Sequence, residues 1–369
     1  MSGVVTRQSD DLRFMALALS LGRRGLGRSW PNPAVGAVIA KDGFIVGRGW
    51  TQPGGRPHAE VEALRRSGEA ARGATLYVTL EPCSHFGKSP PCADAVIAAG
   101  ISRVVSAIED PNPEVAGQGH ARLRAAGIAV DVGLGADEAR RDHAGHILRI
   151  TKGRPRVLLK LAISADGKAG AAGGQPVAIT GEEVRQRVHL LRAENDAIMI
   201  GITTALADDP MLTCRLPGMS GRSPVRVIAD SQLRLPVSSH LVRSAHETPA
   251  WIMSGKEAPQ DAVSKLSSHG VEVLQLADNT GPLDLEAALG ALAAKGITRL
   301  MVEGGPTLAA AFIAADLVDE AVLFQAPMLV GPAGVDALAS EAEAALFTRL
   351  KKVSSAPVGG DQQDTYLRR

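Results

Sequence analysis

The chain has 369 residues, of which 45% are hydrophobic and 21% are charged, an ordinary globular composition that is long enough for two domains of about 150 residues. Forty basic and 39 acidic residues leave a net charge of +1 with no long run of one sign, which excludes an electrostatic footprint for nucleic acid and favours a small-molecule partner. No apolar run approaches the roughly 18 residues of a membrane span, so we expect none.

The first predicted element is a helix near the N-terminus. Asp10 is suited to cap it, and apolar residues at helical spacing predict its buried stripe: Leu12, Met15, Ala16 and Leu19. Aspartates precede this apolar segment and arginines follow it, which is the wrong charge order for a secretory signal. Because the chain has only three cysteines and no disulfide framework, we expect a reducing compartment, the cytoplasm.

A hairpin and a second helix are predicted next. Asp42-Gly43 separates the apolar segments 35–39 and 44–46, and this dipeptide is a strong signal for a two-residue turn. The helix is expected to begin at about His58 and to bury Val61 and Leu64.

The stretch from His58 to Cys92 carries the clearest chemistry. His58 begins a His-Ala-Glu triplet, and Cys83 and Cys92 follow with eight residues between them. One imidazole and two thiolates suit zinc, and three protein ligands leave a fourth tetrahedral position for water, whose pKa zinc lowers to about 7. Glu60, two residues past the histidine, is placed to carry the proton to the leaving group.

Prolines stand directly before both cysteines and predict helix starts, where backbone N–H groups lower the pKa of a thiol and favour its metal-binding form. This order of residues is typical of zinc nucleobase deaminases, although their two cysteines are separated by only two residues. The alternative to a zinc site is that the two cysteines are small buried core residues and that the His-Ala-Glu triplet is a surface turn. A non-catalytic module with structural zinc is another, but a closed structural site takes four protein ligands and only three are aligned.

After the zinc stretch, strands alternate with helices, which predicts a mixed sheet with helices on its faces. The predicted elements are strands at 75–80, 103–108 and 128–132 and helices at 92–99 and 118–126. Residues 136–150 are expected to form a linking helix, with His143 and His146 on a solvated or packed face. Turn residues follow, so we divide the chain into two domains, residues 1–153 and residues 154–369.

The second domain begins with a predicted strand at 156–163. A capping box at Thr180 to Glu183 opens a predicted helix that ends near Ala193. Further segments predict a helix at 285–295 and strands at 197–200, 225–229, 250–253, 271–276, 300–302 and 321–324. No Gly-x-Gly-x-x-Gly follows a strand, which counts against a Rossmann domain.

Two segments of this second α/β domain follow strands, where such sheets place ligands. Glu303-Gly304-Gly305 precedes a helical run at 308–315. Its glycines allow close approach of a ligand, and the helix start favours a phosphate. The alternative is a Gly-Gly turn that binds no ligand. Residues 201–210 are predicted as a strand end and a polar loop, in which Asp208 is either a ligand contact or a cap.

Together these motifs resemble the bifunctional riboflavin-biosynthesis proteins that fuse a diaminohydroxyphosphoribosylaminopyrimidine deaminase to a 5-amino-6-(5-phosphoribosylamino)uracil reductase. The resemblance covers almost the whole chain, and the eight-residue cysteine spacing is this family's form. It rests on the segments Pro31–Gly36, His58–Glu60, Pro82–His85 with Pro90–Cys92, Leu159–Ala162 with Asp166–Lys168, Leu206–Pro210 and Glu303–Gly305.

The resemblance implies a cytidine-deaminase-like domain followed by a dihydrofolate-reductase-like domain, which act in succession on one phosphoribosylated pyrimidine. In the first domain zinc would be held by His58, Cys83 and Cys92, with Glu60 as the proton shuttle. The positions that match the family's substrate contacts in this domain are Asn32, His85 and Lys88.

In the second domain the resemblance implies NADPH as the cofactor. The matching contacts are Ala162, Thr204, Asp208, Ser231 and the turn and helix Gly305, Pro306, Thr307, Leu308, Ala309, Ala310 and Ala311. The implied substrate contacts are Pro176, Arg192, Leu212, Arg215 and Glu303. Arginine suits a ribose phosphate, since its planar fork can grip two oxygens. A homo-oligomer is also expected.

The chain departs from the family at one stretch, where Pro176-Val177-Ala178 replaces a common Ser-x-Trp. Any contact there must come from a backbone carbonyl or from packing. A deaminase of another nucleobase, joined to an unrelated C-terminal domain, is the alternative function; it fails if the protein oxidises NADPH with the deaminated pyrimidine.

Overall fold

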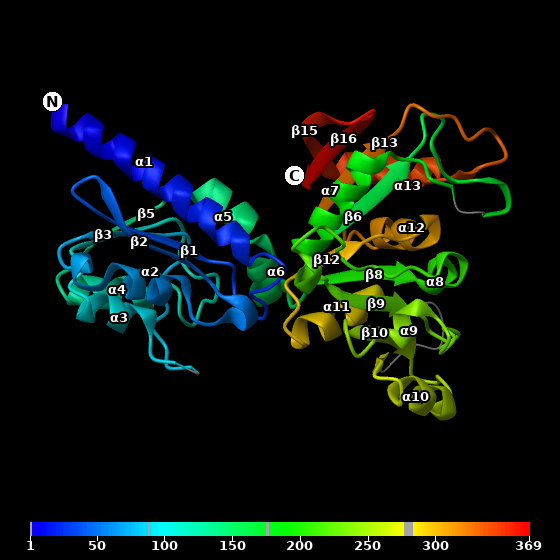
Figure 1. Cartoon of the computed structure of the whole chain (residues 1–369), viewed down its shortest axis with the longest axis horizontal. Coiled ribbons are helices and arrows are strands. Elements are labelled where there is room, and N and C mark those ends of the chain that lie inside the picture. Colours follow the sequence, from blue (N-terminus) through cyan, green and yellow to red (C-terminus); the bar gives the residue numbers. More distant parts are fainter. Residues whose placement is uncertain (1, 88, 175–176, 277–282) are drawn as a thin grey trace. The chain divides into compact units, whose positions relative to one another are not determined.

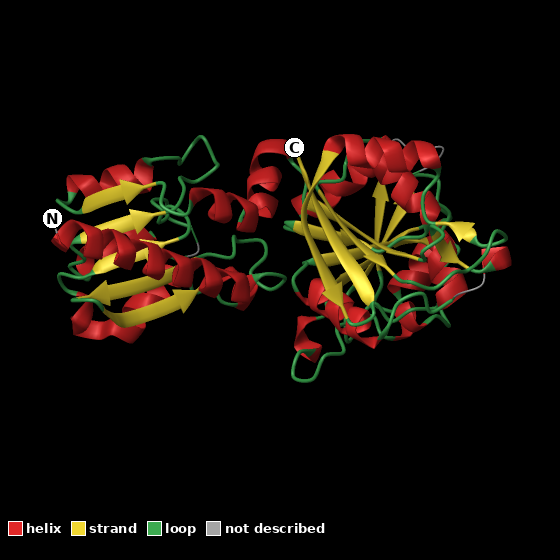
Figure 2. Cartoon of the chain, turned by 90° about the horizontal axis from the view of Figure 1, so that it is seen from above, coloured by secondary structure: helices red, strands yellow, loops and turns green. Residues whose placement is uncertain are grey.

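The backbone divides at Gly153 into two units, Met1–Gly153 and Arg154–Arg369. The structure, a computed structural model, describes residues 2–87, 89–174, 177–276 and 283–369. Each unit contains a sheet that is flanked by helices, as Figure 2 shows by colour. In the described part of the chain, no helix is long and apolar enough to span a bilayer.

The sheet of the first unit has five strands in the order β2-β1-β3-β4-β5. Their bounds are β1 Gly36–Lys41, β2 Phe44–Trp50, β3 Thr75–Val78, β4 Arg103–Ser106 and β5 Ala129–Val132. β1 runs antiparallel to both of its neighbours, and β3, β4 and β5 are parallel. Asp42 and Gly43 have φ values of 51° and 81° in the turn between β1 and β2, which confirms the predicted hairpin.

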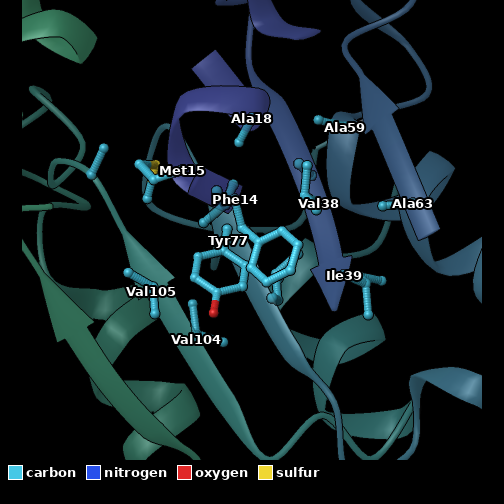
Figure 3. Close-up of a cluster of buried hydrophobic side chains, with 14 of the residues drawn as sticks. Phe14, Met15, Ala18, Val38, Ile39, Ala59, Ala63, Tyr77, Val104 and Val105 are labelled. Atoms are coloured by element: carbon cyan, nitrogen blue, oxygen red, sulfur yellow. The ribbon is translucent and has the colours of Figure 1, made fainter. Parts of the chain in front are cut away.

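Helices cover both faces of this sheet. α1 (Ser2–Gly22) crosses one face, and α2 (Ala59–Ser67), α3 (Cys92–Ala98) and α4 (Gln118–Ala125) lie against the other (Figure 1). β1 is therefore buried on both sides and reads as a continuous apolar run. Figure 3 shows the core between α1 and the strands, where the rings of Phe14 and Tyr77 pack with their centroids 5.2 Å apart.

Glycines on β2 allow α2 to pack directly on the strand backbone. A Cβ atom at Gly49 would lie 2.3 Å from the carbonyl oxygen of Ala59, and one at Gly47 would lie 2.4 Å from that of Ala63. These approaches fix the height of α2 above the sheet, and with it His58 and Glu60 at the start of the helix.

Three predictions about the helices of the first unit are wrong. α1 begins at Ser2 and not at an Asp10 cap, and Leu12 and Ala16 are exposed, because the sheet buries the stripe that contains Phe14, Met15, Ala18 and Leu19. Val61 of α2 also faces outward. The predicted linking helix is two helices, α5 (Ala136–Asp142) and α6 (Ala144–Lys152), which meet at a buried His143.

The second unit has a nine-stranded sheet in the order β11-β10-β9-β8-β12-β6-β13-β16-β15, and β7 pairs with β14 beside it. The strands from β11 to β13 in this order are parallel, and β16 and β15 run antiparallel at the edge. The bounds are β6 Arg156–Ile163, β7 Lys168–Gly170, β8 Ala197–Gly201, β9 Val225–Ala229, β10 Ala250–Gly255, β11 Glu272–Leu276, β12 Arg299–Val302, β13 Glu320–Gln325, β14 Val335–Asp336, β15 Leu350–Val358 and β16 Asp361–Arg368. The predicted bounds of β6 and β9 are confirmed.

The helices of this unit are α7 Glu182–Ala193, α8 Ile202–Asp208, α9 His240–Arg243, α10 Gln260–Ser267, α11 Leu285–Ala294, α12 Pro306–Ala314 and α13 Ser340–Arg349. The predicted capping box is wrong, because Gly181 is the N-cap of α7 and its N–H donates to the Asp361 carboxylate at 2.7 Å. The predicted polar loop at 201–210 is mostly the helix α8. The hairpin of β15 and β16 was not predicted.

Candidate active sites

Three elements of the first unit bring the predicted zinc ligands together. His58 is the N-cap of α2, Cys83 lies in the loop after β3, and Cys92 is the first residue of α3. Their ligand atoms all lie within 4.8 Å of one another. The His58 Nδ1 atom is 3.3 Å from the Cys92 sulfur and 3.7 Å from the Cys83 sulfur, so three donors suited to zinc converge on one point.

The electrostatics of the two thiols favour a bound cation. The Cys92 N–H donates to the Cys83 sulfur at 3.2 Å, and hydrogen bonding from Cys92 lowers the pKa of the Cys83 thiol to about 4. The neighbouring Cys83 sulfur and burial raise the pKa of Cys92 far above its usual range. Two adjacent thiols resist losing both protons unless a cation compensates them, so this donor set fits zinc.

Glu60 lies in the first turn of α2 and is only 3% exposed. Burial raises the pKa of this carboxyl group to about 7, while the charge on His58 acts in the opposite direction. A carboxyl group with a pKa near neutrality can accept a proton and return it, which is what a proton shuttle requires.

The structure places Asn32 behind the imidazole. Its side-chain nitrogen donates to the Gly55 carbonyl at 2.9 Å and lies 3.2 Å from the Nε2 atom of His58, the nitrogen that faces away from the thiols. Asn32 therefore lies directly beside the predicted zinc ligand. His85 is exposed in the loop after Cys83, and Lys88 lies outside the described residues.

In the second unit, the predicted cofactor contacts lie at the carboxyl ends of neighbouring strands. Thr204 is in α8 directly after β8, and its hydroxyl accepts from the Gly305 N–H after β12 at 3.3 Å. Ala162 lies near the end of β6 and Ser231 just past β9. Because β9, β8, β12 and β6 are adjacent in this order, one edge of the sheet carries all four residues.

Glu303 is the centre of a largely buried ionic cluster at the same edge. Its carboxylate accepts from the Lys160 ammonium at 3.3 Å and from Arg192 at 2.9 and 3.1 Å. Burial acts to raise the pKa of Glu303, but the two cations hold it below its usual value. Burial and the charge of Glu303 together raise the pKa of Asp208, the last residue of α8.

Lys160 is a candidate functional residue to which sequence reasoning assigned no role. The available signal was a lysine in the otherwise apolar segment Val157–Ile163, where a charge needs a buried partner. Among the other predicted contacts, Arg215 is exposed, Leu212 is buried, and Pro176 lies outside the described residues. Ala309 is a buried residue of α12.

Fold and sites define a class of protein: a zinc-binding deaminase domain followed by a reductase domain. Residues 8–108 match the family model described as the cytidine and deoxycytidylate deaminase zinc-binding region, and residues 155–363 match the RibD C-terminal domain. The chain is 45% identical over 333 residues to riboflavin biosynthesis protein RibD of Escherichia coli, covering 87% of this chain and 89% of that protein. The Aquifex aeolicus protein of the same name is 44% identical over 87% of this chain and 88% of its own.

Solved structures give the same result. The structure of Acinetobacter baumannii RibD has a TM-score of 0.87 and 36% identity, and covers 98% of this chain and 99% of that one. A Thermotoga maritima deaminase/reductase has a TM-score of 0.85 and 34% identity, and covers 98% and 100%. The chain belongs to the RibD family and is a bifunctional enzyme of riboflavin biosynthesis, as the sequence motifs predicted.

Proposed function

We propose that the first unit deaminates 2,5-diamino-6-(5-phosphoribosylamino)pyrimidin-4(3H)-one by hydrolysis, with zinc held by His58, Cys83 and Cys92. The observation that carries this proposal is the convergence of these three donors beside the buried Glu60. The Thermotoga maritima relative is named as a diaminohydroxyphosphoribosylaminopyrimidine deaminase, which supports the substrate.

Zinc, when bound, would supply activation of a water molecule for attack on the pyrimidine ring. The chain's own residues do the rest. Glu60 takes a proton from the attacking water and delivers it to the leaving amine, and its burial keeps water from competing for that proton. Asn32, which lies beside the His58 ring, is proposed to contact the substrate together with His85 and Lys88.

We propose that the second unit then reduces the ribosyl group of the deaminated product to ribityl with NADPH. The sheet edge that carries Ala162, Thr204, Ser231 and Gly305 is the proposed cofactor surface, together with Asp208 and the exposed parts of α12. The reductase domain fits a nicotinamide cofactor, which would supply the hydride. Glu303, which is held by Lys160 and Arg192, is the proposed substrate contact at the same edge of the sheet.

Arg215 and Arg192 are proposed to recognise the ribose phosphate. In the described part of the chain, no hydrogen bond or ion pair engages the Arg215 guanidinium, whereas Arg192 is oriented by Glu303 and by the Thr213 carbonyl at 3.2 Å. A guanidinium without an internal partner is available for a bidentate contact with phosphate.

The cytoplasm is the proposed location, since two free cysteines in the zinc site need a reducing compartment to stay thiols. A homo-oligomer is the proposed assembly. Light scattering on the purified chain checks the assembly, and a mass that fits a single chain at working concentration contradicts it.

The central experiment mixes the purified chain with zinc, the diaminopyrimidine substrate and NADPH, and follows ammonia release and NADPH absorbance together. Both signals are expected, with ammonia release first. Ammonia release without NADPH oxidation would refute the proposed reductase step. If a folded and zinc-loaded protein gives neither ammonia release nor NADPH oxidation, the substrate assignment is refuted.

A further inference from the structure

A buried carboxylate two residues before Cys83 makes an unusual set of hydrogen bonds. Glu81 is 5% exposed, and each of its oxygens accepts two backbone N–H groups. One oxygen accepts from Gly119 at 2.7 Å and His120 at 3.2 Å, and the other from Asp110 at 3.1 Å and Gly117 at 2.9 Å. Four amide dipoles therefore surround this carboxylate.

These contacts make Glu81 the N-terminal cap of α4, supplied from another segment. The N-cap residue of α4 is Gly117, which has no side chain to accept from the first turn. Gly119 and His120 are in that first turn, so their N–H groups would lack a partner within the helix. The Glu81 carboxylate satisfies them and also complements the positive end of the helix dipole.

α4 in turn holds the segment around Cys83 from both sides. A Cβ atom at Gly119 would lie 2.0 Å from the Pro82 carbonyl oxygen, so the helix packs against the backbone just before the ligand. The Arg122 side chain donates to the Ser84 carbonyl at 3.3 Å, just after the ligand, and pairs with Asp94 of α3 at 2.6 Å. Cys83 is thus fixed between two contacts with one helix.

The position of Cys83 matters for both thiols. Its carbonyl accepts from the Ala93 N–H at 3.1 Å and its sulfur from the Cys92 N–H at 3.2 Å, so the start of α3 is built on it. We propose that Glu81 is a positioning residue of the deaminase, which fixes the Cys83 thiolate for zinc by capping α4. This inference rests on the proposed zinc site, and gives a role to a residue that the zinc motif leaves without one.

Glu81→Gln tests the proposal without changing side-chain size. The amide nitrogen cannot accept hydrogen bonds, so two of the four backbone N–H groups lose their acceptor. We expect zinc affinity, measured by competition with a chromophoric chelator, to fall about 10- to 100-fold, the usual effect of removing a group that supports a metal ligand. In the cobalt-substituted protein, the visible and thiolate absorption bands should shift, because they report ligand geometry.

Asp11→Asn is the matched control. It removes a part-buried carboxylate of the same unit that accepts from Tyr77 and Arg103, neither of which is a zinc ligand. Zinc affinity and the cobalt spectrum should stay at parent values, and NADPH oxidation by the second unit should be unchanged in both variants. An equal loss of zinc affinity in both variants would overturn the proposal, because it would report general destabilisation of the unit.

Gly119→Ala gives a second test that alters no charge. The added methyl group pushes α4 away from Pro82, so the cobalt bands should shift in the same direction as in Glu81→Gln. Parent-like zinc affinity and an unshifted cobalt spectrum in Glu81→Gln would overturn the positioning role. If the parent chain itself bound no zinc, the proposed deaminase site would fail instead, so the two failures are distinguishable.

Discussion

At the scale of single residues, a substitution of Glu60 tests the proposed proton transfer of the deaminase most directly. Glu60→Gln keeps the size of the side chain but removes its ability to accept and return a proton. General acid–base groups contribute typically 10²- to 10⁴-fold in rate, so deamination should fall by at least about 10²-fold. Zinc content should stay at the parent value, because three other donors already converge on the metal position. Metal analysis and an ammonia assay on one preparation measure both.

The second unit supplies the control for this variant, because it should reduce the deaminated intermediate at about the parent rate. Loss of zinc from Glu60→Gln would make the residue a metal ligand. Retained deamination would remove it from the mechanism.

Arg215 carries the prediction for phosphate recognition. Arg215→Lys replaces a two-pronged planar donor by a point charge. Losing one hydrogen bond to a charged group costs about 1.5 kcal/mol, so the KM for the phosphorylated substrate should rise about tenfold while the KM for NADPH stays near the parent value. Steady-state NADPH oxidation with each ligand varied in turn measures both constants.

Arg185→Lys is the matched control, since Arg185 is an exposed arginine of the same unit whose ion pair is with Glu182 at 3.7 Å. Both KM values should be unchanged in it. If Arg215→Lys raises only the KM for NADPH, Arg215 has been assigned to the wrong ligand.

At the scale of elements, the glycines of β2 determine how closely α2 packs on the sheet, and so where His58 and Glu60 lie. In Gly49→Ala the new methyl group would meet the Ala59 carbonyl at 2.3 Å and the Glu62 Cβ atom at 2.8 Å, and backbone cannot yield as a flexible side chain does. α2 must lift and carry His58 and Glu60 with it. Overpacking of this kind costs typically 1–3 kcal/mol, so we expect lower thermal stability of the first unit together with reduced deamination.

Gly290→Ala is the control for this change, because nothing lies within 4 Å of a Cβ atom at Gly290 of α11. Calorimetry and the two activity assays should show a protein at least as stable as the parent, with both activities intact. Parent-like deamination in Gly49→Ala would show that α2 can shift without moving its first turn.

Sequence reasoning succeeded for elements whose pattern allows one answer. The Asp42-Gly43 turn has positive φ at both residues, which few other dipeptides tolerate, and β6 is an apolar run of strand length ending near turn residues. It failed where partners distant in sequence decide. α1 has two possible apolar stripes, and packing against the sheet determines which one is buried. At the start of α7, the Gly181 N–H donates to the carboxylate of Asp361, far along the chain, and the predicted capping box is not formed.

The β15–β16 hairpin could not be read from the sequence for a related reason. Most of β15 is exposed at the edge of the sheet, so it shows no apolar periodicity. The candidate zinc site was readable because metal ligation constrains residue types directly, and three donors were named correctly as a group that converges. The Lys160 contact with Glu303 depends on strand β6 lying beside β12, which sequence alone does not reveal.

At the scale of the whole molecule, the two proposed chemistries fall on opposite sides of Gly153. The three zinc donors precede it, and the proposed cofactor and substrate contacts of the reductase follow it. Stripping zinc with a chelator should therefore abolish ammonia release and leave NADPH oxidation unchanged when the deaminated intermediate is supplied directly. Adding zinc back should restore ammonia release.

Circular dichroism on the stripped protein is the necessary check, because unfolding of the first unit would abolish ammonia release whatever the role of zinc. Cys83→Ser offers the same test without a chelator, since a hydroxyl is a far poorer zinc ligand than a thiolate. If a folded, zinc-free protein of either kind loses NADPH oxidation, then the reductase depends on the metal site. The assignment of one chemistry to each unit would then be wrong, because nothing in the proposed reductase contacts requires a metal donor from residues 1–153.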